Sequence, residues 1–236
     1  MNKYRENLFE SYFDSIFGKS NVFSEKARRA RTDNYELNYG KFLPKNKDAK
    51  ILDIGSGAGN FLYFLKNKGY KNFMGIDISP QQVDFCKKNV SEHVEVANAF
   101  EFLKDKEIFY DVIVANDLLE HIVKEKTIAF LRMVNKTLKN KGVLLIKTPN
   151  MGNPFGISSR YRDFTHEIGF TEKSLYQVLY IAGFRNIQVV GAIAKDKWIF
   201  RILKKIIYFS LKKLYWYQGF VAQEILNSNL IAVAKK

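Results

Sequence analysis

The side chains best suited to acid–base chemistry include two of the three histidines. His166 lies in the segment RYRDFTHEIGF, residues 160–170, and is a candidate general base because an imidazole exchanges a proton near neutral pH. Asp163 is placed to orient its ring. His121, in LLEHI, is a second candidate base or, alternatively, a structural histidine that bonds a neighbouring loop. His93 precedes a strand and lies at the opposite edge of the predicted sheet, so we exclude it as a candidate base.

Two arginines in the same segment could bind an anion. Arg160 and Arg162 can each bind a phosphate or carboxylate through two hydrogen bonds, and Tyr161 between them is a further candidate substrate contact. The alternative is a surface turn held by ion pairs, which contribute little. Because VLLIKTPN just before it is typical of a buried strand ending in a turn, we expect residues 160–170 to be a loop beyond a strand end.

A glycine-rich loop, LDIGSGAG at residues 52–59, indicates a cofactor site. Its glycines let the backbone turn sharply and approach a ligand without a Cβ in the way. The spacing is G-x-G-x-G rather than G-x-G-x-x-G, and Asp53 would place a negative charge beside any phosphates. A carboxylate there suits a ligand with an ammonium and a sulfonium, as S-adenosylmethionine has, although Asp53 could also simply orient the loop amides.

An acid after the next predicted strand completes this site. Asp77 lies in GIDIS, eighteen residues after Gly59, where a carboxylate can accept hydrogen bonds from both hydroxyls of an adenosine ribose. A nicotinamide dinucleotide would use the same acid, so Asp77 alone does not separate the two cofactors. The glycine spacing favours S-adenosylmethionine.

The elements that must position these residues alternate between strand and helix. Buried strands are predicted at AKILDIG, KNFMGIDIS, HVEVANA, YDVIVAND and VLLIKTP. Helices are predicted between them at GNFLYFLKNKG, SPQQVDFCKKNV, AFEFLKD and KTIAFLRMVNKTLKNKG, the second of them with Ser79 as its cap and Pro80 in its first turn. Such alternation implies a parallel sheet with helices on both faces and a ligand at the carboxyl ends of its strands.

The remaining segments flank this core. Residues 1–45 are expected to form a helical preamble, and TEKSLYQVLYIAGF a helix with Thr171 and Ser174 as candidate caps. The sixth and seventh strands are predicted at RNIQVVGAI and SNLIAVAKK, with a helical insertion at 195–222 between them. Because the chain has no repeat and no Pro/Gly-rich linker, we predict a single domain over residues 1–236.

Four motifs, LDIGSGAG, GIDIS, VANAFEFL and YDVIVANDLLEHI, together resemble those of the class I S-adenosylmethionine-dependent methyltransferases, in their small-molecule branch. The resemblance covers about residues 41–184. It implies an α/β, Rossmann-like fold with a seven-stranded, mostly parallel sheet in the order 3-2-1-4-5-7-6, the last strand antiparallel, and helices on both faces. The hairpin-capable pair of strands at the carboxyl end agrees with this order.

The same resemblance assigns contacts to the cofactor. It implies that the glycine loop binds the methionine part, Asp77 the ribose, Ile78 the adenine face and the main chain near Asn116 the amino acid end. The implied cofactor residues are Asp53, Gly55, Ser56, Gly57, Gly59, Asp77, Ile78, Asn98, Ala99 and Asn116. One departs from the family pattern, because Asn98 stands where an Asp usually meets the adenine amino group. Its amide oxygen can still accept that hydrogen bond.

The stretch DFTHEIGF is similar to one in methyltransferases of bacterial capsule, O-antigen and other surface-polysaccharide pathways. This similarity implies a sugar, nucleotide sugar or phosphorylated glycan precursor as the acceptor, which two arginines would suit. The expected function is transfer of a methyl group to an oxygen or nitrogen of a small, anionic, carbohydrate-related acceptor. Nothing in the sequence requires a metal ion.

Composition limits the compartment and the partners. A single cysteine, Cys86, excludes an internal disulfide framework and, with only three histidines, argues against a structural zinc site. The amino terminus lacks a signal-like apolar stretch and no segment is apolar for long enough to span a membrane, so we expect a cytoplasmic protein, free or peripheral at the inner membrane face. The net charge of +14 suits nucleic acid, an acidic membrane or a phosphorylated substrate, or it reflects an AT-rich genome.

Other functions stay open at this stage. An RNA or DNA base methyltransferase suits the positive charge, but the Asp/Asn-Pro-Pro-aromatic motif is missing after the fourth strand and Cys86 is not placed as a cytosine nucleophile. Residues 198–217 combine apolar and basic positions at helical spacing, as in a peripheral membrane helix, a lid or a dimer element. A nicotinamide dehydrogenase and a non-catalytic scaffold are lesser alternatives.

Overall fold

Seven strands form one sheet in the computed structural model, which describes Leu8 and residues 24–104, 107, 109–195, 198–221 and 223–236. Their order is β3-β2-β1-β4-β5-β7-β6, and β7 runs antiparallel to both of its neighbours. The strands are β1 (Ile51–Ile54), β2 (Phe73–Asp77), β3 (Val94–Val96), β4 (Tyr110–Asn116), β5 (Leu138–Pro149), β6 (Arg185–Gly191) and β7 (Asn229–Lys235). The predicted strand order and the antiparallel last strand are confirmed.

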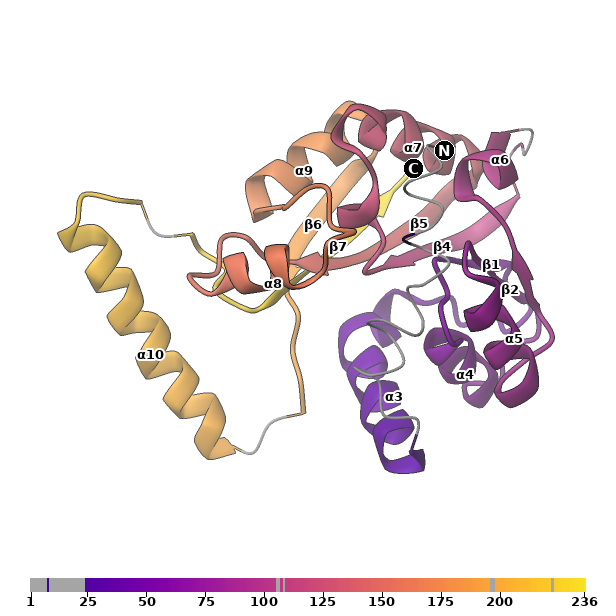
Figure 1. Cartoon of the computed structure of the whole chain (residues 1–236), viewed down its shortest axis with the longest axis horizontal. Coiled ribbons are helices and arrows are strands. Elements are labelled where there is room, and N and C mark those ends of the chain that lie inside the picture. Colours follow the sequence, from indigo (N-terminus) through magenta and orange to yellow (C-terminus); the bar gives the residue numbers. More distant parts are fainter. Residues whose placement is uncertain (1–7, 9–23, 105–106, 108, 196–197, 222) are drawn as a thin grey trace.

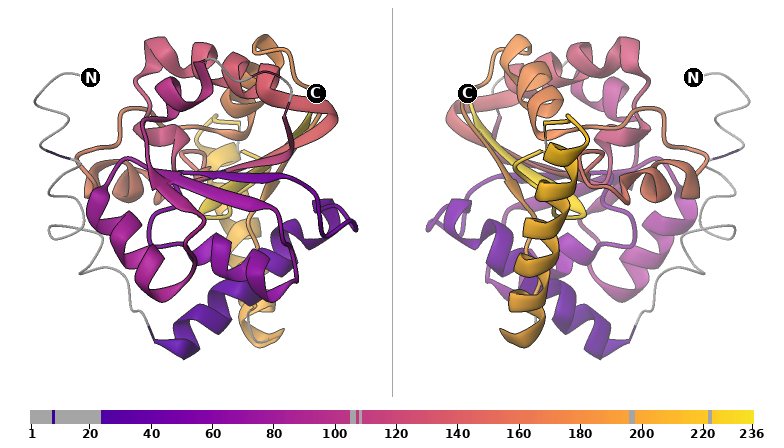
Figure 2. Two further views of the ribbon diagram at one scale, coloured as in Figure 1. Left: turned by 90° about the vertical axis from the view of Figure 1, so that its right-hand side faces the viewer. Right: turned by 90° about the vertical axis from the view of Figure 1, so that its left-hand side faces the viewer.

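Helices cover both faces of this sheet (Figures 1 and 2). One face carries α3 (Glu25–Tyr39), α4 (Asn60–Asn67) and α5 (Pro80–Asn89), and the other carries α6 (Ala99–Lys104), α7 (Lys124–Thr137) and α9 (Glu172–Ile181). The remaining helices are η2 (Gly40–Phe42), η3 (Leu119–His121), α8 (Gly156–Arg162) and α10 (Trp198–Tyr217). Of the predicted helical preamble, α3 and η2 are seen, and residues 1–7 and 9–23 lie outside the described part of the chain.

Helix starts follow the predicted capping residues. The Ser79 side chain accepts a hydrogen bond from the Gln82 amide, with Pro80 in the first turn of α5. At α9, Thr171 and Ser174 form a reciprocal capping box, in which each side chain accepts from the other residue's backbone. These caps satisfy amides that have no partner inside the helix, so they fix where each helix leaves its strand loop.

Two apolar clusters hold the helices to the sheet. On one side, Phe61 and Phe64 of α4 pack with Tyr39 at the end of α3. On the other, Phe130 of α7 packs in a cluster with Phe184, just before β6. Each of these five side chains is at most 2% exposed, and burying one such side chain stabilises the fold by about 1.5–3 kcal/mol. The strands between the clusters are therefore fixed from both faces.

β5 begins earlier than the sequence predicts. The helical pattern of KTIAFLRMVNKTLKNKG continues into LKNKG, but this part of the chain belongs to the strand. Leu138 is fully buried and pairs with Tyr110 of β4, and the Lys139 ammonium binds both carboxylate oxygens of Asp111 at 2.9 and 2.8 Å. These contacts with β4 override the local helix propensity.

The predicted insertion contains α10, a helix of 20 residues. Figure 1 shows α10 standing away from the sheet and from the helices that cover it. None of the described helices combines the length and the apolar character needed to cross a membrane.

Candidate active site

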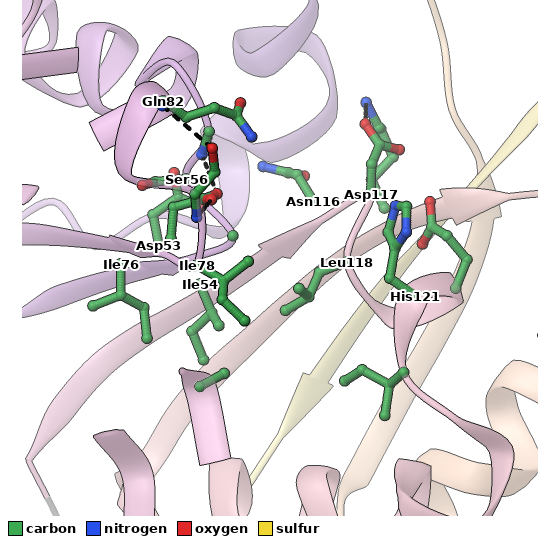
Figure 3. A pocket seen from close by; sticks show the side chains of 18 of the residues that line it. Asp53, Ile54, Ser56, Ile76, Ile78, Gln82, Asn116, Asp117, Leu118 and His121 are labelled. Carbon is green, nitrogen blue, oxygen red and sulfur yellow. Dashed lines mark hydrogen bonds and ion pairs between the residues drawn. The ribbon is translucent and has the colours of Figure 1, made fainter. Parts of the chain in front are cut away.

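A cavity of about 1380 Å³ opens at the carboxyl ends of the parallel strands. Its walls come from the loops after β1, β2, β3 and β4, from the end of β5, and from the start of β7, whose antiparallel direction brings that end to the same edge. Since the strand order reverses between β1 and β4, the loops there diverge and leave room for a ligand. A cavity thus lies where the sequence predicts the ligand, and ligand binding there stays a prediction. Figure 3 shows Asp53, Ser56 and Gln82 on one side of the cavity, Asp117 and His121 on the other, and Asn116 between them.

Most of the predicted site residues line this cavity. They are Asp53, Gly55, Ser56, Gly57, Asp77, Ile78, Asn98, Ala99, Asn116, His121, Arg162, Asp163 and His166. Three predicted residues, Gly59, Arg160 and Tyr161, are not among its walls. Lining the cavity does not by itself show that a residue binds a ligand, so the binding and catalytic roles of these residues stay predictions.

Steric constraints explain why the glycine loop has a glycine at position 59. Its φ is +79°, which favours glycine, and a Cβ built there would overlap the Cys86 sulfur of α5. Gly59 is the residue before α4 and carries no side chain between α4 and α5. Its role in the structure is therefore to let these helices approach, while Gly55 and Gly57 face the cavity.

Asp77 holds the glycine loop from the end of β2. One carboxylate oxygen accepts a hydrogen bond of 2.8 Å from the Gly57 amide, and the other accepts one of 2.9 Å from the Ser79 amide. Burial raises the pKa of this carboxyl, and the backbone hydrogen bonds oppose that rise. A carboxylate has about four lone-pair positions, so Asp77 retains acceptor capacity toward ribose hydroxyls.

Four buried polar atoms beside the loop have no hydrogen-bond partner among the described residues. They are Asp53 Oδ1, Ser56 Oγ, Gln82 Oε1 and Asn116 Nδ2. An unmade hydrogen bond at a buried polar atom costs about 1–3 kcal/mol, so four together at one cavity wall indicate a ligand that pairs with them. The set contains acceptors and a donor, which fits the amino acid part of S-adenosylmethionine with its ammonium and carboxylate.

Asp53 is the titratable residue among these four. It is 2% exposed, and burial together with the charge of Asp77 raises its pKa to about 8 from an ordinary value of 3.8. A cation in the cavity would lower that pKa again and favour the carboxylate. Asp53 is therefore suited to bind an ammonium group, as its position in the loop predicts.

Asn98 has a structural partner. Its side-chain oxygen accepts a hydrogen bond of 2.9 Å from the Phe100 amide, at the start of α6. This contact is a local turn of the kind that Asn often makes. The oxygen has a second lone pair, so the predicted contact with an adenine amino group stays open.

The opposite end of the cavity holds the two candidate histidines. The rings of His121 and His166 meet edge to face with centroids 4.7 Å apart. His166 Nδ1 lies 2.9 Å from the carbonyl oxygen of Ser159, and since a carbonyl only accepts, Nδ1 carries the proton. Ser159, in α8, is thus the residue that orients His166.

Asp163 orients His121 rather than His166. Its Oδ1 accepts hydrogen bonds from the Thr165 amide at 2.9 Å and from the Thr165 hydroxyl at 2.6 Å, and that hydroxyl oxygen lies 2.8 Å from His121 Nδ1. The distance from Asp163 Oδ2 to His166 Nε2 is 3.9 Å, which is longer than a hydrogen bond. The expected pairing of Asp163 with His166 is thus corrected. Burial, with the charge of His166, lowers the pKa of His121 to about 4, so its ring is neutral at neutral pH.

Three further residues complete the histidine end of the cavity, and the sequence does not predict a role for them. Glu120 is 2% exposed, accepts a hydrogen bond of 3.0 Å from the Thr148 hydroxyl, and has its pKa raised to about 8 by burial and by the charge of Asp117. Lys147 and Asp117 form an ion pair of 2.5 Å beside it. A signal existed in LLEHI, where Glu120 is an acid in an otherwise apolar run next to a histidine.

The predicted anion clamp is only partly in place. Residues 156–162 form the short helix α8 rather than a loop, so Arg160 and Arg162 point in different directions. Arg160 donates to the carbonyl oxygens of His166 and Glu167, the latter at 3.0 Å, and Tyr161 is 75% exposed. Arg160 therefore holds the histidine loop in place, while Arg162 lines the cavity and is the arginine available to an anion.

The chain matches a known protein family and resembles several known proteins. The family model "Methyltransferase domain" matches residues 24–189. A carboxy-S-adenosyl-L-methionine synthase of Campylobacter jejuni is 30% identical over 173 residues, which are 69% of this chain and 69% of that protein. A phosphoethanolamine N-methyltransferase of Plasmodium falciparum is 25% identical over 209 residues, or 84% of this chain and 73% of that protein. Two further relatives, an uncharacterized protein of Rickettsia prowazekii and a ribosomal protein L11 methyltransferase of Dictyoglomus turgidum, match over 46% and 34% of their own length.

Among solved structures, a SAM-dependent methyltransferase from Archaeoglobus fulgidus has the same fold. The TM-score is 0.67 at 22% identity, and the match covers 90% of this chain and 97% of that one. The chain thus has the Rossmann-like fold of a known methyltransferase.

Proposed function

The chain belongs to the methyltransferase domain family, which uses S-adenosylmethionine, and we propose that it methylates an oxygen or nitrogen of a small, anionic, carbohydrate-related acceptor. One observation carries this proposal. The unpaired buried atoms of Asp53, Ser56 and Gln82 share a single cavity with the paired rings of His121 and His166. This arrangement supports the proposal of a cofactor site and, opposite it, a site for proton chemistry.

The cofactor end supplies binding and alignment. Asp77 would accept the ribose hydroxyls while it holds the glycine loop through the Gly57 amide, and Asp53 would bind the ammonium group. S-adenosylmethionine supplies a methyl group on a positively charged sulfur that leaves as a neutral thioether. Because such a displacement needs an in-line approach, the protein acts chiefly by fixing the acceptor opposite that sulfur.

The histidine end would bind the acceptor. An acceptor hydroxyl must lose its proton as its oxygen bonds to the methyl carbon, so proton-accepting or oxygen-binding groups are required there. Glu120, His121 and His166 supply such groups within the cavity. The guanidinium of Arg162, which also lines it, favours an acceptor that carries phosphate or carboxylate. A phosphorylated acceptor is also in keeping with the similarity to a phosphoethanolamine N-methyltransferase.

Product analysis tests this function. Protein incubated with radiolabelled S-adenosylmethionine and a small-molecule extract should place the label in a product that binds an anion exchanger and carries one added methyl group. Label recovered only in RNA would contradict the proposal and favour a nucleic-acid acceptor. Because one relative is a carboxy-S-adenosyl-L-methionine synthase, mass spectrometry of the cofactor is the necessary control, and a modified cofactor without a methylated acceptor would also contradict it.

A second candidate function, contact with an anionic membrane during methylation of a lipid-linked acceptor, rests on α10. Apolar side chains along it are exposed, among them Ile206 at 57%, Phe209 at 64% and Trp216 at 77%. Its sequence WIFRILKKIIYFSLKKLYWY contains no acid, and the four lysines at positions 204, 205, 212 and 213 are exposed. A basic, aromatic and apolar helix standing off the body suits a membrane surface of negative charge.

Vesicle flotation tests this second function. Wild-type protein should float with vesicles containing phosphatidylserine and remain behind with phosphatidylcholine alone. Charge reversal of Lys212 and Lys213 to Glu should weaken flotation by roughly tenfold or more, given about 1 kcal/mol per lysine near the surface. The matched control reverses Lys87 and Lys88, also adjacent and exposed but on α5. Equal loss in both variants, no flotation at all, or a dimer in solution would refute the membrane role of α10.

A further inference from the structure

Three ligand-type side chains converge at the histidine end of the cavity. One coordinating atom from each of Glu120, His121 and His166 can be chosen so that all three lie within 4.8 Å of one another. Ligands bound to one ion at 2.0–2.2 Å lie about 3–4.4 Å apart, so a small rotation of the side chains would bring them to a common metal. The residues come from η3 and from the loop after α8, which are far apart in sequence.

The hydrogen bonds around both imidazoles suit metal binding. The Thr165 hydroxyl gives its proton to Asp163, so its oxygen accepts from His121 Nδ1, and His166 Nδ1 donates to the Ser159 carbonyl. In a neutral ring with the proton on Nδ1, the lone pair lies on Nε2. Metal-binding histidines are commonly fixed in this way by a carboxylate or carbonyl behind the ring. Each ring would therefore bind an ion through Nε2.

Glu120 supplies a buried oxygen in need of a partner. Its Oε2 accepts from the Thr148 hydroxyl, while Oε1 has no hydrogen-bond partner among the described residues although the side chain is 2% exposed. A buried carboxylate oxygen without a partner is strongly disfavoured. A cation at the cluster would satisfy that oxygen.

We infer that Glu120, His121 and His166 bind one divalent transition-metal ion. Two imidazoles and one carboxylate favour borderline ions such as Mn²⁺, Fe²⁺, Co²⁺ or Zn²⁺, whereas Mg²⁺ and Ca²⁺ prefer oxygen ligands alone. These ligands do not form a local spacing motif, so the sequence alone does not predict a metal site. His121 and His166 are 45 residues apart, and only the fold brings them together.

The site would act on the acceptor, and this role rests on the proposed function. All three ligands line the cavity that also contains the predicted cofactor residues, so the ion's open positions would face the acceptor. An oxygen bound to a divalent ion loses its proton more easily than a free one. The histidines would then hold the ion, and the ion would bind the acceptor oxygen, whose proton would pass to solvent water in the open cavity while the methyl group leaves the sulfonium as a neutral thioether forms.

Metal binding to the protein alone tests the inference. Protein treated with a chelator and then titrated with Mn²⁺, followed by electron paramagnetic resonance, should bind one ion per chain, and Zn²⁺ or Co²⁺ should displace it. Glu120→Gln and His166→Ala should each weaken binding by at least about tenfold. Thr165→Val removes the hydroxyl that links Asp163 to His121 but leaves all three ligands, and it should weaken binding by about 10- to 100-fold.

The chain offers a matched control in His93→Asn. His93 is the third histidine, and its ring packs against Phe73 away from the cavity. Binding should be unchanged in this variant. Titration of each variant with S-adenosylhomocysteine shows that it is folded, because the cofactor end is unaltered.

The outcomes separate the two proposals. Absence of a one-to-one Mn²⁺ complex, or equal weakening by the His93 and Glu120 substitutions, would overturn the metal site. If S-adenosylhomocysteine then still binds and methyl transfer persists in chelator, the proposed function stands and the histidines act as direct bases. If S-adenosylhomocysteine fails to bind wild-type protein, the proposed function fails, whatever the metal result.

Discussion

The two ends of the cavity are built in different ways. At the cofactor end, a continuous loop and one acid make the site through backbone contacts, as when Asp77 accepts from the Gly57 and Ser79 amides. At the histidine end, side chains from separate segments hold one another, as in the chain from Asp163 through Thr165 to His121. The first arrangement is local in sequence, whereas the second is assembled by the fold from segments far apart in the chain.

If the two ends act separately, a change at the histidine end should affect turnover alone. His166→Ala removes a group proposed to handle the acceptor oxygen, whether as a base or as a metal ligand. Turnover should fall by about 100-fold or more, the range for loss of acid–base or metal assistance, while S-adenosylhomocysteine affinity stays within a factor of two or so. An unchanged rate would make His166 a structural residue and remove the contrast.

The reciprocal change is Asp77→Ala at the cofactor end. It removes hydrogen bonds to two loop amides and the proposed acceptor of the ribose hydroxyls. Hydrogen bonds to a charged group contribute about 1.5–3 kcal/mol each, so S-adenosylhomocysteine affinity should fall by about 100-fold or more. Mn²⁺ binding should be unaffected. Near-wild-type cofactor affinity by calorimetry would refute the ribose assignment.

A substitution in the packing behind the glycine loop should have a smaller effect, on stability rather than on binding. Gly59→Ala places a Cβ against the Cys86 sulfur and in a backbone conformation with φ of +79°. The free energy of unfolding in urea should fall by about 1–3 kcal/mol. In a Cys86→Ala background the same substitution should be less harmful, because the overlap is removed and only the backbone strain remains. Equal losses in both backgrounds would show that the contact with Cys86 has no influence.

The free energy of unfolding should depend on pH through Asp53, a buried acid of the cofactor end. Asp53 has a pKa of about 8 in the folded chain and an ordinary value of 3.8, so the folded state holds its proton longer than the unfolded state. Its contribution to stability is fully present below about pH 3.8 and is lost as pH rises to about 8. Ligand-free wild type should therefore lose more unfolding free energy than Asp53→Asn between pH 5 and 8. Parallel curves for the two proteins would show that Asp53 is already ionised.

The sequence predicts these two ends unequally. LDIGSGAG and GIDIS predict the cofactor loop and Asp77 because those residues act through neighbouring backbone. Alternating apolar segments predict a parallel sheet, and the resemblance to methyltransferases predicts its strand order. The pairing of Arg160 with Arg162 is not predictable from their closeness in sequence, because α8 turns their side chains apart. Asp163 is near His166 in sequence, but its Oδ1 accepts from the Thr165 hydroxyl, which contacts His121. Glu120 gained its importance only from burial beside two distant histidines, which no local pattern shows.

Calorimetric titration with S-adenosylhomocysteine and, separately, with NADH tests most directly the claim that the glycine-loop end of this cavity binds S-adenosylmethionine. We predict that S-adenosylhomocysteine binds with one molecule per chain, that NADH gives no heat of binding, and that Asp77→Ala abolishes the first signal. Binding of NADH, or of neither ligand, would contradict the account.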